Sequence, residues 1–184
     1  MKIVLMRHAK PDLTPPFPLK LMSAIDFNLF SSEYDNGGIT YKRDHILDFD
    51  LEHYFVCCSD LKRSQDTAYL FDRKPNVIDP LFSEVRFSKI ESLFPAPYAL
   101  FSLLCQFRWF FNLNSDYEDR KKTVLRAKIA SDFLEKLAGE HKNLLVITHG
   151  IFLKVLAKEL IKRKWLTFKK NKYNYLEYSI FNKL

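Results

Sequence analysis

The sequence predicts an α/β domain of three layers with a mostly parallel central sheet. Short, unbroken apolar runs alternate with segments of helical periodicity, which is typical of strands covered by helices on both faces. Three of the apolar runs end directly in polar groups: the first in Arg7-His8, the second in Ser59 and the third in His149. Because the carboxyl ends of parallel strands share one edge of a sheet, we expect a site at that edge.

The size and charge of the chain set further limits. Its 184 residues, 47% of them hydrophobic, suffice for the core of one domain, which we predict over residues 1–184 with a small insertion. The formal charge of +7 would suit nucleic acid or an anionic membrane, but the cations are scattered along the chain. A basic balance suits equally well an enzyme that attracts phosphate esters. Charge alone does not decide between these classes. We expect no nucleic-acid partner, and a membrane partner is the less favoured interpretation.

Cysteine usage predicts a reducing compartment. Cys57 and Cys58 are adjacent within an apolar run, and only Cys105 remains as a partner, so no disulfide framework is expected. No pair has the spacing of a zinc site. The N-terminal apolar run is too short for a signal-peptide core, and charged residues follow it at once. We therefore expect a cytoplasmic protein.

The N-terminal quarter of the chain predicts one strand, a surface loop and one helix. The apolar run after Lys2 reads as a short buried strand. Four prolines between Pro11 and Asn28 predict an irregular surface loop over that segment. A turn signal at residues 36–38 precedes Thr40, which is a suitable cap for a helix over residues 41–51.

The next part of the chain predicts a strand, a helix and a second short strand. Residues 54–58 are uniformly apolar, and Ser59 is a suitable cap for a helix that reaches Phe71. Arg63 lies in the first turns of this helix, where backbone N–H groups attract anions. Taken alone, Arg63 could equally be an exposed arginine of an ordinary helix. Residues 76–80 predict a short strand that ends at a proline.

Residues 88–114 predict a helical flap inserted in the domain. The segment is rich in aromatic residues, and interspersed proline, glutamine and arginine make a membrane-spanning helix a poor interpretation. One face is expected to pack on the domain, and the other could roof a pocket or meet a partner. A helix that only packs in the core is the alternative.

The C-terminal part of the chain continues the alternation. Residues 116–138 have the apolar spacing of an amphipathic helix, and residues 144–148 form a buried strand that ends at His149. A helix is expected directly after Gly150. Residues 162–172 form a basic run that predicts an exposed face, and residues 175–181 predict an edge strand.

The three strand ends together predict an anion site. Arg7, His8, Arg63 and His149 would meet at one sheet edge and form a pocket suited to a dianionic phosphoryl group, with one imidazole free to attack. This pattern resembles the histidine phosphatase superfamily, which has the phosphoglycerate mutase-like fold. The resemblance spans nearly the whole chain and is carried by Arg7-His8, Ser59-x-Leu61-x-Arg63-Ser64-x-x-Thr67-Ala68, Glu84 and Thr148-His149-Gly150.

The resemblance implies a role for each of these side chains. His8 would be the nucleophile that becomes a phosphohistidine, while its other ring nitrogen donates to a backbone carbonyl. Arg7, Arg63 and His149 would bind the phosphoryl oxygens. Glu84 would protonate the leaving oxygen, which requires a raised pKa, and would later take a proton from water. The resemblance implies no metal and no cofactor.

The chain departs from the family pattern at several positions. Ala9 and Arg43 stand where glycine is usual or frequent, and residues 88–92 lack the Glu-Gly pair that commonly follows the acid. The segment 88–114 carries no family motif, so we expect it to select the substrate.

The resemblance implies a metal-independent phosphatase that acts on a phosphorylated small molecule or a phosphoprotein. Three alternatives stay open. One is phosphoryl transfer of the phosphoglycerate mutase type, although mutases of this family are generally longer. A second is a phosphate-binding module without turnover. The third is association with a membrane surface through the flap and the basic tail.

Overall fold

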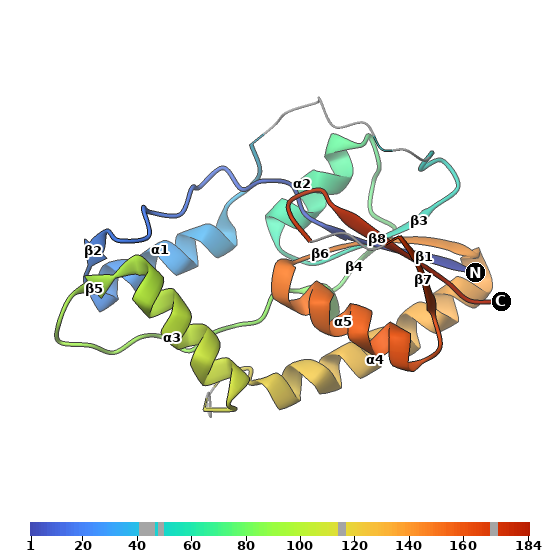
Figure 1. Cartoon of the computed structure of the whole chain (residues 1–184). Helices are drawn as coiled ribbons and strands as arrows, with labels where there is room; N and C mark the ends of the chain where they lie inside the picture. The colour runs from blue at the N-terminus through green and yellow to red at the C-terminus, as the bar shows by residue number, and fades with distance from the viewer. Residues whose placement is uncertain (41–46, 48–49, 114–116, 170–172) are drawn as a thin grey trace.

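The computed structural model describes residues 1–40, 47, 50–113, 117–169 and 173–184 (Figure 1). Its centre is a six-stranded sheet in the order β4-β3-β6-β1-β8-β7. Four neighbouring strands are parallel, whereas β8 and β7 pair antiparallel at one side. The mostly parallel sheet is therefore confirmed. The strands are β1 (Lys2–Arg7), β3 (Phe55–Cys58), β4 (Val77–Ile78), β6 (Asn143–Thr148), β7 (Leu166–Lys169) and β8 (Tyr178–Asn182).

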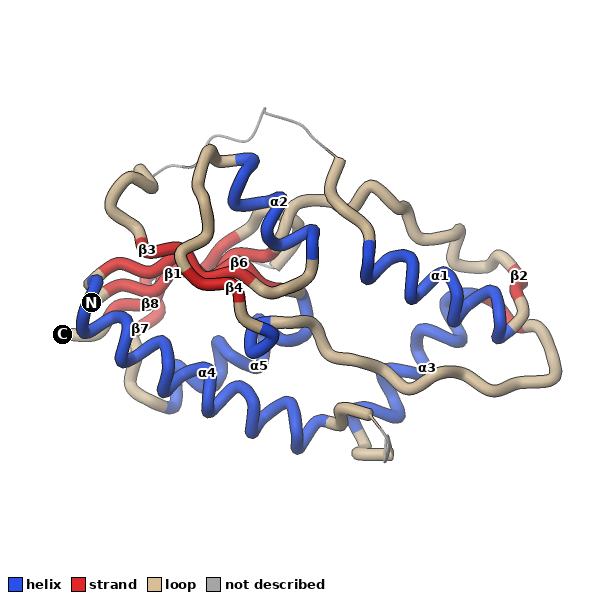
Figure 2. Tube along the Cα trace, turned by 180° about the vertical axis from the view of Figure 1, so that it is seen from behind, coloured by secondary structure: helices blue, strands red, loops and turns tan. Residues whose placement is uncertain are grey.

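Helices cover both faces of this sheet, as the apolar strands require (Figure 2). Alternate residues of β1 point to opposite faces: Ile3 packs with α4 (Arg120–His141) and α5 (Gly150–Lys162), and Val4 with α2 (Lys62–Leu70). Both side chains are fully buried. The predicted arrangement in three layers is therefore confirmed.

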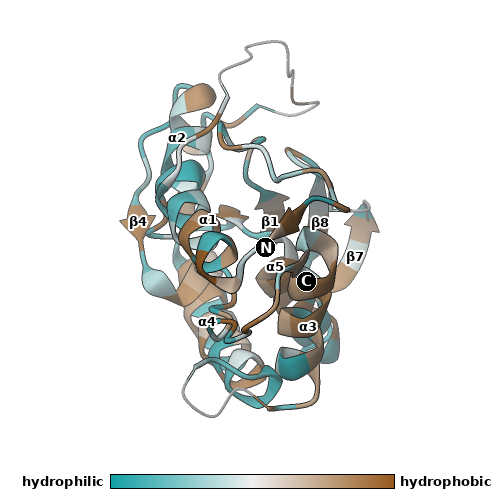
Figure 3. Cartoon of the chain, turned by 90° about the vertical axis from the view of Figure 1, so that its left-hand side faces the viewer, coloured by the Kyte–Doolittle hydropathy of each residue, from teal (hydrophilic) through white to brown (hydrophobic). Residues whose placement is uncertain are grey.

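A lobe extends from the sheet on the side opposite the two termini (Figure 1). It consists of α1 (Ala24–Asn36), α3 (Tyr98–Phe110) and a two-stranded sheet of β2 (Leu21–Met22) and β5 (Ala96–Pro97). Phe27 of α1 and Phe101 of α3 are buried against each other in a separate small core. In Figure 3, which looks onto this lobe, α3 is largely hydrophobic.

Helix α1 corrects the prediction of a loop between Pro11 and Asn28. The prolines exclude a helix only as far as Pro18, and the helix begins after Ser23, whose side chain accepts a hydrogen bond from the Asp26 N–H. The turn signal after residue 35 then ends this helix. Its apolar stripe is short because it packs only on the lobe and not on the main sheet.

Two other predictions need correction. Ser59 does not cap α2, which begins at Lys62; its hydroxyl instead accepts the Leu61 N–H at 3.1 Å in the preceding turn. The basic run is not only an exposed face, because residues 166–169 pair with β8 as the edge strand β7. Lysines are common on such exposed edges.

The strand predicted over residues 175–181 is β8, but it is not an edge strand, because it pairs with β1 on one side and β7 on the other. The other predicted elements within the described residues agree with the structure except at their ends. The helix predicted over residues 41–51 lies mostly outside the described ranges, and its described residues 47, 50 and 51 are not helical. The first residue of the helix predicted from Asp116 also lies outside these ranges. Asp119 caps α4 by accepting the Lys122 N–H. Among the described residues, no helix is long and apolar enough to cross a membrane.

Candidate active site

The three strand ends that carry polar motifs are neighbours in the sheet. Arg7 of β1 lies opposite Thr148 of β6, and the His8 N–H donates to the Thr148 carbonyl at 3.0 Å. On the other side of β6, the Ser59 N–H donates to the Ile147 carbonyl at 3.2 Å. Parallel pairing therefore brings residues from distant parts of the chain to one edge.

His8 lies at the centre of this edge and is only 2% exposed. Its Nδ1 donates to the Ala9 carbonyl at 2.7 Å, because a carbonyl oxygen can only accept. The expected backbone partner is thus confirmed. Nε2 remains as the ring nitrogen available for chemistry. The His149 ring lies beside it, with 4.9 Å between ring centroids.

Both histidines are held in their neutral form. Burial, helped by the charges of Arg63 and Arg7, lowers the pKa of His8 to about 3, although the hydrogen bond to the Ala9 carbonyl acts in the opposite direction. Burial, His8 and the nearby arginines also lower the pKa of His149 well below its usual value. At neutral pH the Nε2 atom of His8 therefore carries a free lone pair.

The lowered pKa values predict a loss of stability in acid. Between about pH 6.5 and pH 3 the unfolded chain protonates His8 while the folded chain does not, so the free energy of unfolding falls as the pH is lowered. The expected slope is about 1.4 kcal/mol per pH unit for each of His8 and His149. Urea denaturation at pH 7 and pH 5 measures it. The double variant His8→Gln, His149→Gln should flatten the slope, and an unchanged slope would contradict this explanation.

Arg63 joins the sheet edge to the lobe. Its side chain is 1% exposed, and its Nη1 donates to the carbonyls of Tyr34 and Asp35 at 3.0 and 3.1 Å. Its Nη2 donates to the Asp35 carboxylate at 3.2 Å. A cation at the carboxyl end of α1 is electrostatically favourable, so the guanidinium fixes this helix over the site.

Arg7 is held by the segment that precedes β8. Its Nη1 donates to the Tyr173 carbonyl at 3.1 Å, and its guanidinium stacks on the Tyr175 ring at 4.2 Å. A Cβ atom at Gly150 would lie 3.3 Å from its Cζ. Glycine therefore allows the close approach between Arg7 and the start of α5.

Four buried nitrogens around His8 have no hydrogen-bond partner among the described residues. They are the Nε atoms of Arg7 and Arg63 and both ring nitrogens of His149. An unpaired buried donor usually costs about 1–3 kcal/mol, so such groups generally serve a ligand or reaction. Donors of this kind around one imidazole fit the oxygens of a phosphoryl group.

Glu84 reaches the same edge from the loop after β4. Its two carboxylate oxygens accept the N–H groups of Ile151 and Phe152 at 3.2 and 3.0 Å, in the first turn of α5. The helix begins at Gly150, directly after its N-terminal cap His149. These two hydrogen bonds hold the Glu84 carboxyl group against the amino end of α5.

One cavity of about 460 Å³ connects these groups with the lobe. Arg7, His8, Arg63 and Glu84 line it, whereas His149 is fully buried and does not. The structure therefore brings four of the five predicted side chains to the cavity wall. His149 lies behind this wall and contacts the His8 ring.

Comparison with known protein families decides the classification. Residues 41–182 match the family model of the histidine phosphatase superfamily (branch 1). This chain belongs to the histidine phosphatase superfamily. Membership supports a histidine-phosphatase-type enzyme and phosphatase or phosphotransfer chemistry in general. Arg7-His8 precedes the matched residues and joins them through the pairing of β1 with β6.

Two solved structures share the superfamily fold. That of the open reading frame Rv3214 from Mycobacterium tuberculosis has a TM-score of 0.55 and 18% identity, over 97% of this chain and 89% of that one. That of a protein from Escherichia coli, proposed to be an alpha-ribazole-5'-P phosphatase, has a TM-score of 0.56 and 19% identity, over 88% and 79%. At these identities the likeness concerns the fold, and it confirms the phosphoglycerate mutase-like architecture. No curated protein sequence matched the chain.

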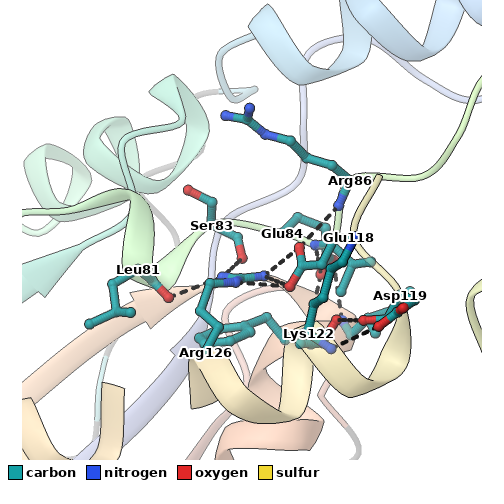
Figure 4. A network of polar contacts seen from close by, with 12 residues as sticks. Leu81, Ser83, Glu84, Arg86, Glu118, Asp119, Lys122 and Arg126 are labelled. Carbon is teal, nitrogen blue, oxygen red and sulfur yellow. Dashed lines mark hydrogen bonds and ion pairs between the residues drawn. The ribbon is translucent and has the colours of Figure 1, made fainter. Parts of the chain in front are cut away.

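Arg126 holds the Glu84 loop in this histidine phosphatase-like chain (Figure 4). Its Nη1 donates to the carbonyls of Leu81 and Ser83 at 3.0 and 2.8 Å. Its Nε and Nη2 donate to the Glu118 carboxylate at 2.9 and 3.0 Å. No sequence pattern indicates this role, because the loop partners are backbone carbonyls. Arg126 therefore positions the residues that directly precede Glu84.

We expect Arg126→Lys to slow hydrolysis of an alkyl phosphate about tenfold, because a lysine cannot bind both carbonyls and the carboxylate as a planar fork. For an activated aryl ester, whose leaving group needs less protonation by Glu84, kcat/KM should fall less. Steady-state kcat/KM for both esters measures the difference. Arg120→Lys, on the same helix, is the control. Equal losses on both esters would show that Arg126 acts only on stability.

Tyr175 and Tyr34 were also absent from the predicted site. Tyr175 stacks on Arg7, and its hydroxyl lies 3.3 Å from that of Tyr34, whose ring lies 5.1 Å from the Arg63 guanidinium. Since β8 runs antiparallel to β1, the residues before it return to the carboxyl edge. The direction of β8 cannot be read from the sequence, so the sequence alone does not place these two tyrosines at the site.

Proposed function

We propose that this protein hydrolyses phosphate monoesters through a phosphohistidine at His8. The observation that carries the proposal is the anchored imidazole of His8, whose Nδ1 donates to the Ala9 carbonyl while Nε2 stays free among unpaired donors. A neutral, oriented imidazole is a competent nucleophile towards phosphorus. The proposed substrate is a phosphorylated small molecule, with a phosphoprotein as the alternative.

In the first proposed step, Nε2 of His8 attacks phosphorus and the bond from phosphorus to the ester oxygen breaks. Glu84 in its protonated form gives its proton to the leaving oxygen. Arg7 and Arg63, which line the cavity, donate to the remaining oxygens and stabilise their charge in the transition state. The single ring N–H of neutral His149 would add a donor from beside the His8 ring. The products are the free alcohol and a phosphoryl group on His8.

In the second proposed step, water attacks the phosphohistidine and the bond from phosphorus to Nε2 breaks. The carboxylate of Glu84 takes a proton from this water, so the acid of the first step is regenerated. Inorganic phosphate leaves, and His8 returns to its neutral form. Dividing one displacement into two lowers the barrier of each.

The proposed mechanism uses the arginine charges in place of a metal ion. Among the described residues, no group of three or more His, Cys, Asp and Glu side chains is placed to bind a metal. We therefore expect phosphate release to persist unchanged after dialysis against EDTA, measured with a colorimetric phosphate assay. Loss of release that returns on adding Mg²⁺ or Zn²⁺ would contradict this part of the proposal.

The proposed compartment is the cytoplasm. It is supported by Cys57, Cys58 and Cys105, which are buried free thiols. Burial raises the pKa of Cys57 and Cys58 to about 12, so neither thiol is poised for redox chemistry.

A product assay tests the proposed hydrolysis. The protein is mixed with a phosphate monoester that carries a second hydroxyl, and free phosphate and isomerised ester are followed together. Hydrolysis predicts stoichiometric release of phosphate and alcohol. Isomerised ester without free phosphate would identify a mutase, and binding without either product would identify a phosphate-binding module.

A further inference from the structure

The cavity is much larger than a phosphoryl group. Its charged end is formed by Arg7, His8, Arg63 and Glu84, and the rest of its 460 Å³ lies beyond them towards the lobe. Cavities of this size bind organic ligands rather than single ions. The additional space is therefore available to bind the organic part of the ester.

The wall of this additional space is aromatic. Six rings line the cavity along with the charged groups: Phe27, Phe30, Tyr34, Phe87, Tyr98 and Tyr117. The Phe30 ring contacts Tyr98 edge to face at 5.7 Å and Tyr34 at 6.0 Å. Because Tyr34 also lies against Arg63, the aromatic surface begins directly beside the phosphoryl end.

Hydrogen bonds fix this wall before any ligand binds. Arg63 holds the carboxyl end of α1, as described above. On the same helix, the Asn28 side chain donates to the Ile90 carbonyl at 2.8 Å and accepts the Ile90 N–H at 2.9 Å. The Tyr98 N–H donates to the Lys20 carbonyl at 2.9 Å and fixes the start of α3. A preorganised wall loses little conformational entropy on binding.

The cations that line the cavity away from its phosphoryl end are exposed to solvent. Arg86 and Lys89 line it, and both are solvent-exposed, whereas Phe27 is buried and Phe30 is half-buried. Exposed cations contribute little to affinity in water. The apolar rings therefore offer the larger contribution to recognition.

From this arrangement we infer that the enzyme selects phosphate monoesters of alcohols that carry an aromatic ring or an apolar group of similar size. The inference rests on the proposed function, because it assigns the organic part of the ester cleaved at His8. With the phosphoryl group among the arginines, an attached ring would stack on Phe30 and Tyr98. A short polar ester would leave this surface uncovered.

Two esters with leaving alcohols of closely similar acidity test the inference. We expect kcat/KM for 2-phenylethyl phosphate to exceed that for ethyl phosphate about tenfold to a hundredfold, from burial of the phenyl ring. The variant Phe30→Ala should lower this ratio towards one, while Phe30→Leu should keep part of it. Phe94→Ala replaces an exposed aromatic residue just before β5 that does not line the cavity, and this variant should keep the parent ratio.

Binding of the matching phosphonates separates this inference from the proposed function. Isothermal calorimetry should give tighter binding of 2-phenylethylphosphonate than of ethylphosphonate by a similar factor, since neither is hydrolysed. A preference in binding without release of phosphate from either ester would overturn the proposed function alone. Equal kcat/KM and equal affinity, or a preference for 3-phosphoglycerate, would overturn the inference.

Discussion

Replacing His8 by alanine is expected to lower phosphate release from 4-nitrophenyl phosphate by at least about a thousandfold. The variant keeps the arginines that bind the phosphoryl group, but it has no atom that can form the covalent intermediate. Initial rates of nitrophenol release under saturating ester measure the loss. Even an activated ester should be affected, because the nucleophile is needed whatever the leaving group.

Folding has to be controlled, because His8 is buried within the sheet edge. His8→Gln supplies a second variant with a side chain that can still donate near the Ala9 carbonyl. Circular dichroism and the urea midpoint show whether each variant is folded. His53→Ala, an exposed histidine, should keep the parent rate. A folded His8 variant with the parent rate would exclude this histidine as the nucleophile.

Replacing Glu84 by glutamine is expected to act according to the leaving group. A glutamine cannot protonate the ester oxygen, so kcat/KM for an alkyl phosphate should fall about a hundredfold or more. For 4-nitrophenyl phosphate, whose leaving group needs no proton, kcat/KM should fall less than about tenfold. This parameter reports only the steps up to formation of the phosphohistidine, so slower hydrolysis of the intermediate does not mask the contrast.

Glu91 is an exposed carboxylate in the same connection between β4 and β5, so Glu91→Gln is the matched control. This variant should keep the parent kcat/KM for both esters. The hydrogen bonds that Glu84 accepts from α5 give a structural control as well, because glutamine can keep only one of them as acceptor. An equal fall in kcat/KM for both esters, at unchanged fold, would reject Glu84 as the acid.

Much of the fold follows from local sequence pattern. Buried parallel strands must be apolar on both faces, so β1, β3 and β6 were visible as unbroken runs, and their ends located Arg7, His8 and His149. Helix α1 was missed for the opposite reason. It packs mainly through Ala24 and Phe27 on a small lobe, so its periodicity is weak.

The rest of the site depends on contacts that leave no pattern in the sequence. Arg126 binds backbone carbonyls, and any residue would supply those acceptors. Tyr175 meets Arg7 only because β8 runs antiparallel to its neighbour. The aromatic wall combines α1 with α3, two helices far apart in the chain, and their meeting is a property of the tertiary fold.

In the proposed mechanism the ester's phosphoryl group passes through Nε2 of His8. The direct measurement is to quench the enzyme in alkali during turnover and to locate the phosphoryl group by peptide mass spectrometry and phosphorus NMR. We expect one phosphoryl group per chain, on His8 and on the ring nitrogen remote from the Ala9 carbonyl. A trapped phosphoryl group on any other residue, or turnover with His8 never modified, would contradict it.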